Sequence, residues 1–211
     1  MQQSHLQAIE IDKIALPENH PSIARDLNNL AGLYESQGKY EEAETLYLKA
    51  IEIDKIALPE NHPFIASHLN NLAKLYRKQG KYEEAEPLFL KAIKIKKIAL
   101  PEKHPSIATN LNNLALLYYS QGKYEEAEPL YLKAIEINKI ALPENHPAIA
   151  IYLNNLAKLY ESQGKYKEAE TLFLKAIEIC KQSLGEKHPN TQGVIKNYQL
   201  FLNEKDNEEN E

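Results

Sequence analysis

The chain has 211 residues, of which 43% are hydrophobic and 26% are charged, and its formal net charge is −5. A single cysteine, Cys180, excludes a disulfide framework and a thiolate metal site. No apolar run reaches the roughly 18–20 residues that span a bilayer. The opening residues, MQQSHLQAIEIDK, lack the basic and apolar regions of a signal peptide. We therefore expect a cytoplasmic protein that does not bind membranes.

Repetition dominates the sequence. The dipeptide His-Pro recurs every 42 residues, at His20, His62, His104, His146 and His188. Division after each histidine yields four repeats that are identical to one another at 27 of their 42 positions. Such a period indicates a tandem array of structural repeats. The predicted organisation is a partial repeat (second helix only) over 1–20, repeats 1 to 4 over 21–62, 63–104, 105–146 and 147–188, a capping helix over 189–202 and a disordered acidic tail over 203–211.

Each repeat is predicted to form two helices. In repeat 1, the proline of His-Pro suits the first helical position, and apolar residues recur at helical spacing from Ile23 to Tyr34. Gly38 supplies the left-handed cap that ends this helix. The second helix starts near Tyr40, with glutamates in its first turns, and ends before Pro59.

Two of the second helices contain an internal proline, Pro87 in repeat 2 and Pro129 in repeat 3. Both prolines fall about one turn into the helix. We expect each to remove one early backbone hydrogen bond without breaking the helix.

An isolated helix pair cannot bury both of its apolar stripes, so neighbouring repeats must stack into a solenoid. The repeat resembles the tetratricopeptide repeat of the longer kinesin-light-chain type, although it lacks the tryptophan that opens the generic first helix. The resemblance implies an all-α fold, a right-handed superhelical solenoid of antiparallel helix pairs, and a non-enzymatic scaffold for protein partners. The residues of repeat 1 that carry it are Leu27, Leu30, Ala31, Tyr34, Gly38, Tyr40, Ala43, Tyr47 and Ala50.

The two ends of the array differ. Residues 1–20 match a second helix without its first helix, which leaves Leu6 and Ile9 short of a packing surface. We expect the chain to be part of a longer array, the alternative being a natural start, and we regard this open face as a candidate for self-association. At the other end, Gln199 replaces a small alanine, which suits a last helix that receives no further repeat.

Positions that differ between repeats indicate where function lies. In the first helix, most of them lie opposite the apolar stripe, and the resemblance implies that this side lines a concave groove. Asn28 and its equivalents lie on the same side but are identical in every repeat. Because asparagine has a poor helix propensity, we interpret them as an amide ladder for an extended peptide backbone. The alternative is that they bridge neighbouring repeats by hydrogen bonds.

The groove residues predict a ligand. Repeat 2 carries a net charge of +5 and directs three basic residues to this side, whereas repeats 3 and 4 place bulky apolar residues there, with Tyr152 at the rim. The favoured function is therefore a protein–protein interaction scaffold for an extended peptide that is acidic beside a bulky apolar anchor. The alternative for the basic residues is a merely solvated face. The predicted peptide-binding residues are Arg25, Asn28, Asn70, Lys74, Arg77, Lys78, Asn112, Leu116, Tyr119, Ile151, Asn154 and Lys158.

Other chemistry is disfavoured. The His-Pro histidines occur once per repeat, and packed helices lie about 8–10 Å apart whereas zinc–nitrogen bonds are about 2 Å, so we assign these histidines to helix capping. The chain has no P-loop, dinucleotide-binding glycine motif or HExxH motif. Cys180 occupies a position that we expect to face solvent, with no catalytic histidine in the pattern. We predict no enzyme, no cofactor and no metal.

Two further classes were weighed against the peptide-binding scaffold. The isolated basic repeat offers no continuous stripe for nucleic acid, so we predict no nucleic-acid partner. A structural spacer or oligomerisation segment of a larger multidomain signalling protein remains the alternative function.

Overall fold

The structure is a computed structural model that describes residue 12 and residues 15–208, with side chains as far as residue 205. The predicted partial repeat over 1–20, with the face expected to self-associate, lies largely outside the described residues. The end of the predicted tail, 209–211, lies outside them too.

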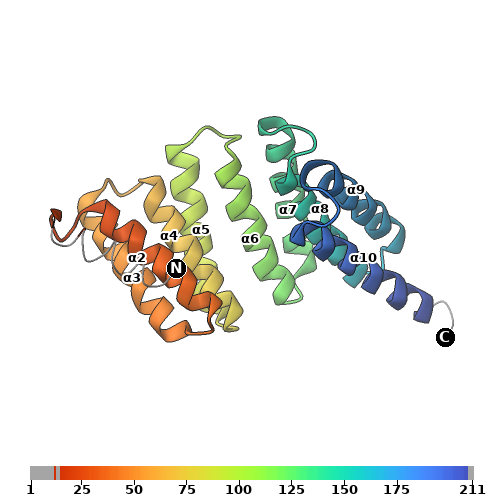
Figure 1. The fold of residues 1–211 in the computed structure, drawn as a ribbon, viewed down its shortest axis with the longest axis horizontal. Coiled ribbons are helices and arrows are strands. Elements are labelled where there is room, and N and C mark those ends of the chain that lie inside the picture. The colour runs from red at the N-terminus through yellow and green to blue at the C-terminus, as the bar shows by residue number, and fades with distance from the viewer. Residues whose placement is uncertain (1–11, 13–14, 209–211) are drawn as a thin grey trace. The chain divides into compact units, whose positions relative to one another are not determined.

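The described residues form α-helices and no strand (Figure 1). Four helix pairs follow one another and a single helix comes last, which confirms the predicted all-α fold of helix pairs. The helices are α2 (Pro21–Ser36), α3 (Tyr40–Ala57), α4 (Pro63–Lys78), α5 (Tyr82–Ala99), α6 (Pro105–Ser120), α7 (Tyr124–Ala141), α8 (Pro147–Ser162), α9 (Tyr166–Leu184) and α10 (Pro189–Glu208).

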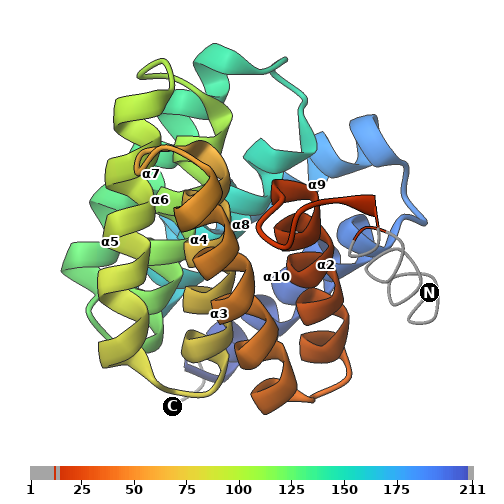
Figure 2. The same cartoon turned by 90° about the vertical axis from the view of Figure 1, so that its left-hand side faces the viewer.

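The chain divides into two compact units, each with its own packed helices. Unit 1, Met1–Pro101, contains α2 to α5, and unit 2, Glu102–Glu211, contains α6 to α10. In unit 1, α2 packs on α3, α3 on α4 and α4 on α5, as Figure 2 shows from the side. In unit 2, each helix from α6 to α9 likewise packs on the next one along the chain.

Each first helix begins at a histidine cap. His20 Nδ1 accepts the backbone N–H of Ser22 at 3.2 Å, which satisfies one of the donors that a helix start leaves unpaired. The same bond, at 3.1–3.2 Å to the N–H two residues ahead, is made by His62, His104, His146 and His188. The predicted capping role of these histidines is confirmed.

The turn between the two helices of a repeat depends on glycine. Gly38, Gly80, Gly122 and Gly164 all have φ between 71° and 76°. This is the left-handed region, in which a side chain is strained.

The internal prolines leave their helices intact. The helices α5 and α7, which contain Pro87 and Pro129, have 18 residues, as does α3 with Thr45 at the equivalent position. This agrees with the expectation that each proline removes one backbone hydrogen bond but does not break the helix.

Alanines and large apolar side chains form the core of each unit. In unit 1, Ala31 of α2 and Ala43 of α3 have no exposed surface, and their small size lets the two helices approach closely. In unit 2, the fully buried rings of Phe173 (α9) and Phe201 (α10) lie 5.4 Å apart between centroids. This aromatic contact fixes α10 against the last helix pair.

Two expectations about the last repeat and the last helix were wrong. The last helix does not end at residue 202 but continues to Glu208, and Lys205 Nζ lies 3.2 Å from Glu170 Oε2 of α9. Cys180 does not face solvent. It has no exposed surface, and the equivalent Asp54, Lys96 and Asn138 are buried too, at 0%, 6% and 1% exposure.

Candidate functional site

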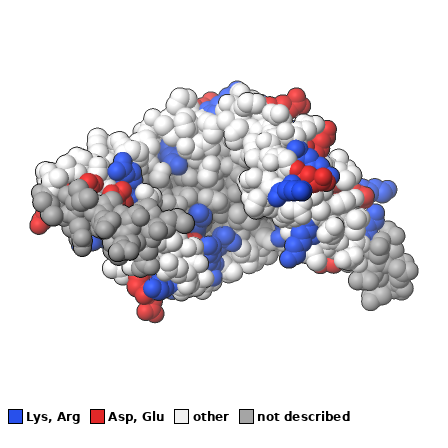
Figure 3. Space-filling view, in the orientation of Figure 1, with Lys and Arg blue, Asp and Glu red and all other residues white. Residues whose placement is uncertain are grey.

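The predicted groove residues lie on the first helices, and each compact unit forms a surface of its own from them. Unit 1 contributes α2 and α4, and unit 2 contributes α6, α8 and α10. In the orientation of Figure 1, Lys and Arg side chains gather over the region of α4 and α5 in unit 1 (Figure 3).

The unit 1 surface contains an open cavity of about 510 Å³. It forms where Gly32 stands in place of the Lys74, Leu116 and Lys158 of the other repeats. A β-carbon at Gly32 would lie 3.6 Å from Tyr47 Oη, so Tyr47 of α3 forms the floor of this cavity. The other lining residues are Asn28, Asn29, Glu35, Ser36, Asn71, Lys74 and Lys78.

A buried carboxylate holds one wall of this cavity. Glu35 is 9% exposed, accepts a hydrogen bond from Tyr47 Oη at 3.0 Å, and pairs with Lys78 Nζ at 2.6 Å. Burial and the neighbouring Glu35 raise the pKa of Tyr47 above its usual range. Because Lys78 is neutralised by Glu35 of the preceding repeat, it offers a ligand less charge than the sequence suggested.

The remaining predicted residues of unit 1 are placed unequally. Lys74 is half-buried, lines the cavity and has no ion-pair partner within the described part of the chain. Arg25 is exposed, and its Nε lies 3.4 Å from Asp26 Oδ1. Arg77 is half-buried, and its Nε is enclosed without a hydrogen-bond partner among the described residues. Asn70 is buried.

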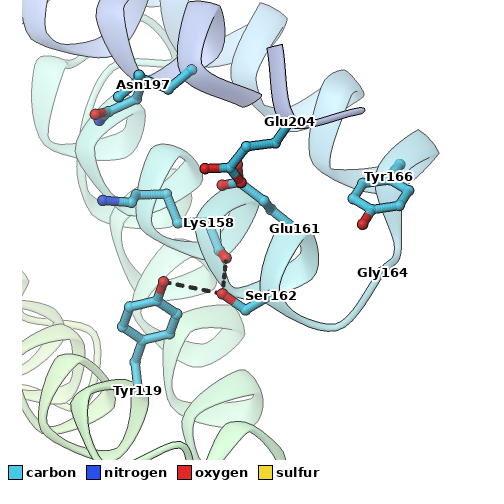
Figure 4. A pocket seen from close by; sticks show the side chains of 9 residues that line it. Tyr119, Lys158, Glu161, Ser162, Gly164, Tyr166, Asn197 and Glu204 are labelled. Carbon is cyan, nitrogen blue, oxygen red and sulfur yellow. Dashed lines mark hydrogen bonds between the residues drawn. The ribbon is translucent and has the colours of Figure 1, made fainter. Parts of the chain in front are cut away.

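The unit 2 surface contains an open cavity of about 700 Å³ (Figure 4). Two predicted residues, Tyr119 of α6 and Lys158 of α8, line it. Tyr119 Oη lies 3.1 Å from Ser162 Oγ, which in turn donates to the carbonyl of Lys158 at 3.0 Å. The other lining residues are Glu161, Gly164, Tyr166, Asn197, Leu200 and Glu204.

Two carboxyl groups face each other in the unit 2 cavity. Figure 4 shows Glu161 of α8 and Glu204 of α10 pointing toward one another. Burial, the charge of Glu204 and a hydrogen bond with Glu204 raise the pKa of Glu161 to about 7, and Lys158 opposes this shift. Near pH 7, the Glu161 carboxyl group is therefore protonated about half of the time.

Three of the four asparagines of the predicted ladder, Asn28, Asn112 and Asn154, bridge successive first helices. Asn71 Nδ2 donates to Asn28 Oδ1 at 3.1 Å in unit 1. In unit 2, Asn155 donates to Asn112 at 3.0 Å and Asn197 donates to Asn154 at 3.0 Å. The bridging interpretation thus describes these three pairs. Each pair uses one acceptor and one donor, so an amide N–H₂ of the accepting residue still has hydrogen-bonding capacity.

The apolar residues predicted for unit 2 lie apart from its cavity. Ile151 is 40% exposed on α8 and Leu116 is half-buried on α6. Tyr152 was expected at the rim but is buried, and its Oη donates to Thr109 Oγ1 at 3.2 Å. Tyr152 was expected at the rim because its position varies between repeats. This part of the first helix also faces the preceding repeat, so a variable residue can be buried there.

Sequence reasoning missed several residues of the two surfaces. Asn71 and Asn197 carried a signal, since both belong to the asparagine column that adjoins Asn28 and persists into the last helix. Glu204 carried none, because it lay in the predicted tail. Within the described ranges, no cluster of His, Cys, Asp or Glu could hold a metal ion, and no helix is long and apolar enough to cross a membrane.

Stacked helix pairs with one repeated polar face define a helical-repeat protein. The sequence model of the tetratricopeptide repeat family matches nearly the whole chain, over residues 2–56, 22–98, 64–140, 106–182 and 148–191. The chain belongs to this family, whose members are typically scaffolds for protein–protein interaction and generally not enzymes. No curated protein matches the sequence.

Solved structures similar to this chain are kinesin-light-chain-like. BtubC (BKLC) from P. vanneervenii is 25% identical, with a TM-score of 0.80 over 95% of this chain and 81% of that one. A candidate kinesin light chain from P. anserina, with nearly identical TPR-like repeats, is 26% identical, with a TM-score of 0.66 over 87% of both chains. A variant of the same P. anserina protein is 27% identical, with a TM-score of 0.72 over 86% of both chains.

Proposed function

We propose that the chain is an interaction scaffold that binds an extended peptide on its first-helix surfaces. Acidic residues of this peptide contact Lys74 in unit 1, and a bulky apolar residue contacts Leu116 and Ile151 in unit 2. The observation that supports this proposal best is Lys74, a cavity-lining lysine without an ion-pair partner in the described ranges, among amide groups that can bond a peptide backbone.

The charges of the two surfaces favour unit 1 as the place where the acidic residues of the peptide bind. There, Lys78 is already paired with Glu35, whereas Lys74 and Arg77 have no ion-pair partner among the described residues. In unit 2, Lys158 shares its cavity with Glu161 and Glu204, which disfavours a second acidic side chain at that place. The apolar part belongs to unit 2, because Ile151 exposes 40% of its surface on the first-helix side.

The absence of tryptophan from this chain allows a direct binding assay. A peptide that carries tryptophan beside several glutamates is titrated with the full chain while its fluorescence is followed. We expect Lys74→Ala to weaken binding about fivefold, since a part-exposed charge pair contributes roughly 1 kcal/mol. Leu116→Ser and Ile151→Ser should weaken it about tenfold each, through the lost apolar contact.

Matched controls lie on the second helices. Lys91→Ala removes an exposed lysine of α5, and Ile140→Ser removes an isoleucine of α7 that is 54% exposed, and neither should change the affinity. For a peptide with glutamine in place of glutamate, Lys74→Ala should leave the affinity unchanged. Equal affinities for all variants would contradict the proposal and favour the structural spacer.

A further inference from the structure

Two buried positions distinguish the junctions between repeats that are otherwise nearly identical. One lies on the second helix of each repeat and is occupied by Asp54, Lys96, Asn138 and Cys180. The other lies on the first helix and is occupied by Asp26, His68, Asn110, Tyr152 and Val194. All nine residues are at most 9% exposed, yet neither position holds the same residue type twice.

This variation is unusual for a protein interior. The alanines that pack between helices are the same in every repeat, as expected where a volume change costs stability. A buried polar or charged residue costs still more unless its partner fits it. A change at only one of these positions would therefore be destabilising, whereas matched changes on both sides of a junction would be tolerated.

In unit 1, the two positions meet across the junction of α3 and α4. His68 Nε2 lies 3.0 Å from Asp54 Oδ2, and the two side chains are only 6% and 0% exposed. All four polar side-chain atoms of Asp54 and His68 are enclosed, and none makes a hydrogen bond among the described residues, so their polar contact is the 3.0 Å approach between them. Each residue thus depends on the other for its polar contact.

In unit 2, the two positions meet across the junction of α7 and α8 with different chemistry. The Tyr152 hydroxyl donates to Thr109 Oγ1 at 3.2 Å and interacts with the side chain of Asn138, whose Oδ1 has no hydrogen-bond partner among the described residues. All three side chains are neutral. With a tyrosine in place of His68, the Asp54 carboxylate would lose the imidazole that it contacts in unit 1.

The last junction, between α9 and α10, is apolar at the same positions. Cys180 and Val194 are buried there at 0% and 5% exposure. The nearby polar contact is made instead by Thr191 Oγ1, which lies 3.4 Å from the carbonyl oxygen of Cys180 and 2.8 Å from that of Gly185.

We propose that these buried pairs determine repeat order within each unit, where a second helix accepts only the first helix that follows it in the chain. The partner at each junction is another repeat of this chain. A carboxylate meets an imidazole between α3 and α4, an amide meets a phenol between α7 and α8, and the residues between α9 and α10 are apolar. A wrong neighbour fits the shared alanines and leucines equally well but leaves a buried polar group unmatched. Near-identical repeats are thereby kept in order and in register.

The test exchanges one pair for another at the α3–α4 junction of the full chain. Two matched double variants copy pairs that occur in unit 2: Asp54→Asn with His68→Tyr, and Asp54→Cys with His68→Val. Two mismatched double variants contain the same four substitutions in the other combinations: Asp54→Asn with His68→Val, and Asp54→Cys with His68→Tyr. Unfolding equilibrium constants are measured with urea, followed by helical circular dichroism.

If each substitution acted by itself, the product of the two folding constants would be the same for the matched set and the mismatched set. If the buried pairs determine repeat order, the product of the folding constants of the two matched variants should be at least tenfold larger than that of the two mismatched variants. A mismatched variant that fails to fold would also support the proposal. Equal products would overturn the proposal.

A milder double-mutant cycle covers the case in which all four exchanges unfold the chain. It uses Asp54→Asn, His68→Gln and their combination, which retain side-chain size. The double variant should fold at least fivefold more favourably than the two single effects combined predict. Additive effects would likewise overturn the proposal.

Discussion

At the scale of single residues, the same position acquires different roles in successive repeats. Glu35 and Glu161 are equivalent in the repeat, yet their neighbours have opposite charge. Glu35 lies between Tyr47 and Lys78, which stabilise its carboxylate. Glu161 faces the carboxyl group of Glu204, which makes its charged form unfavourable. The identity of the neighbouring repeat, rather than the residue type, determines the electrostatics.

Glu161 should make stability depend on pH. Its pKa in the folded chain, about 7, lies above the ordinary glutamate value of 4.5, so the folded state holds the proton over a pH range in which the unfolded state has lost it. The contribution is therefore fully present below about pH 4.5 and is lost as the pH rises through about 7. Glu161→Gln should stabilise the chain by about 1 kcal/mol at about pH 8, since solvent screens part of the full effect.

Urea unfolding of the wild-type chain and the variant at about pH 4 and about pH 8 measures this difference. Glu204→Gln removes the same repulsion from the other helix and should reproduce the gain. Glu178, an exposed glutamate of α9, provides a control, because Glu178→Gln should change stability little at either pH. A gain from Glu161→Gln that is equal at both pH values would contradict the raised pKa of Glu161.

At the scale of helices, the local signals in the sequence were sufficient and the long-range ones were not. Histidine caps, glycine turns and apolar spacing depend on neighbours within one or two turns, and all appear where expected. Burial of Cys180 depends instead on the next first helix. Because the equivalent residues are Asp, Lys and Asn, the position was assigned to solvent.

The extended last helix shows the same limit. Tyr76 Oη donates to Glu44 Oε1 at 2.9 Å while Lys81 Nζ lies 3.4 Å from Glu44 Oε2, and this clasp joins successive repeats. In α10, Tyr198 and Lys205 make the same contacts with Glu170, at 3.3 and 3.2 Å. Both come earlier in the repeat register than their counterparts, so no alignment of repeats could reveal the role of Lys205.

The internal prolines allow a prediction for a whole helix. Thr45 and Thr171 occupy the position of Pro87, and their hydroxyls donate to the carbonyls of Glu41 and Lys167 at 3.0 and 2.9 Å. Pro87→Thr should therefore stabilise the chain, by about 1 kcal/mol rather than the roughly 3 kcal/mol of a mid-helix site, because the structure tolerates proline in this early turn.

The reciprocal change is the matched control. Thr45→Pro should destabilise the chain by a similar amount without shortening α3, as measured by thermal unfolding and by helical circular dichroism of the folded state. A loss of helical signal at low temperature, or a destabilising Pro87→Thr, would show that the prolines are required by their own repeats.

At the scale of the whole molecule, near-identity of repeats creates an assembly problem. Because 27 of 42 positions are the same in all four repeats, most of the buried surface cannot tell one neighbour from another. Repeat arrays are stabilised by nearest-neighbour interfaces, so a repeat stacked in the wrong order would recover most of the native interface energy. The few variable buried residues must then supply the difference between right and wrong order.

Removal of repeat 2 tests this at the level of the array. In a chain that lacks residues 63–104, α3 is followed directly by α6, and Asp54 meets Asn110 instead of His68. We expect Asn110→His to stabilise this shortened chain by roughly 1–3 kcal/mol, because it restores a partner for the buried carboxylate. The midpoint of urea unfolding, followed by circular dichroism, measures the effect.

The same substitution in the full chain is the control. There Asp54 already has His68, so Asn110→His gains no partner of that kind and should leave stability unchanged or reduced. Stabilisation of similar size in both chains would mean that histidine is simply favourable at this position. Stabilisation confined to the shortened chain would show that the buried pair determines which helices fit together at a junction, since every other residue of the interface is unchanged.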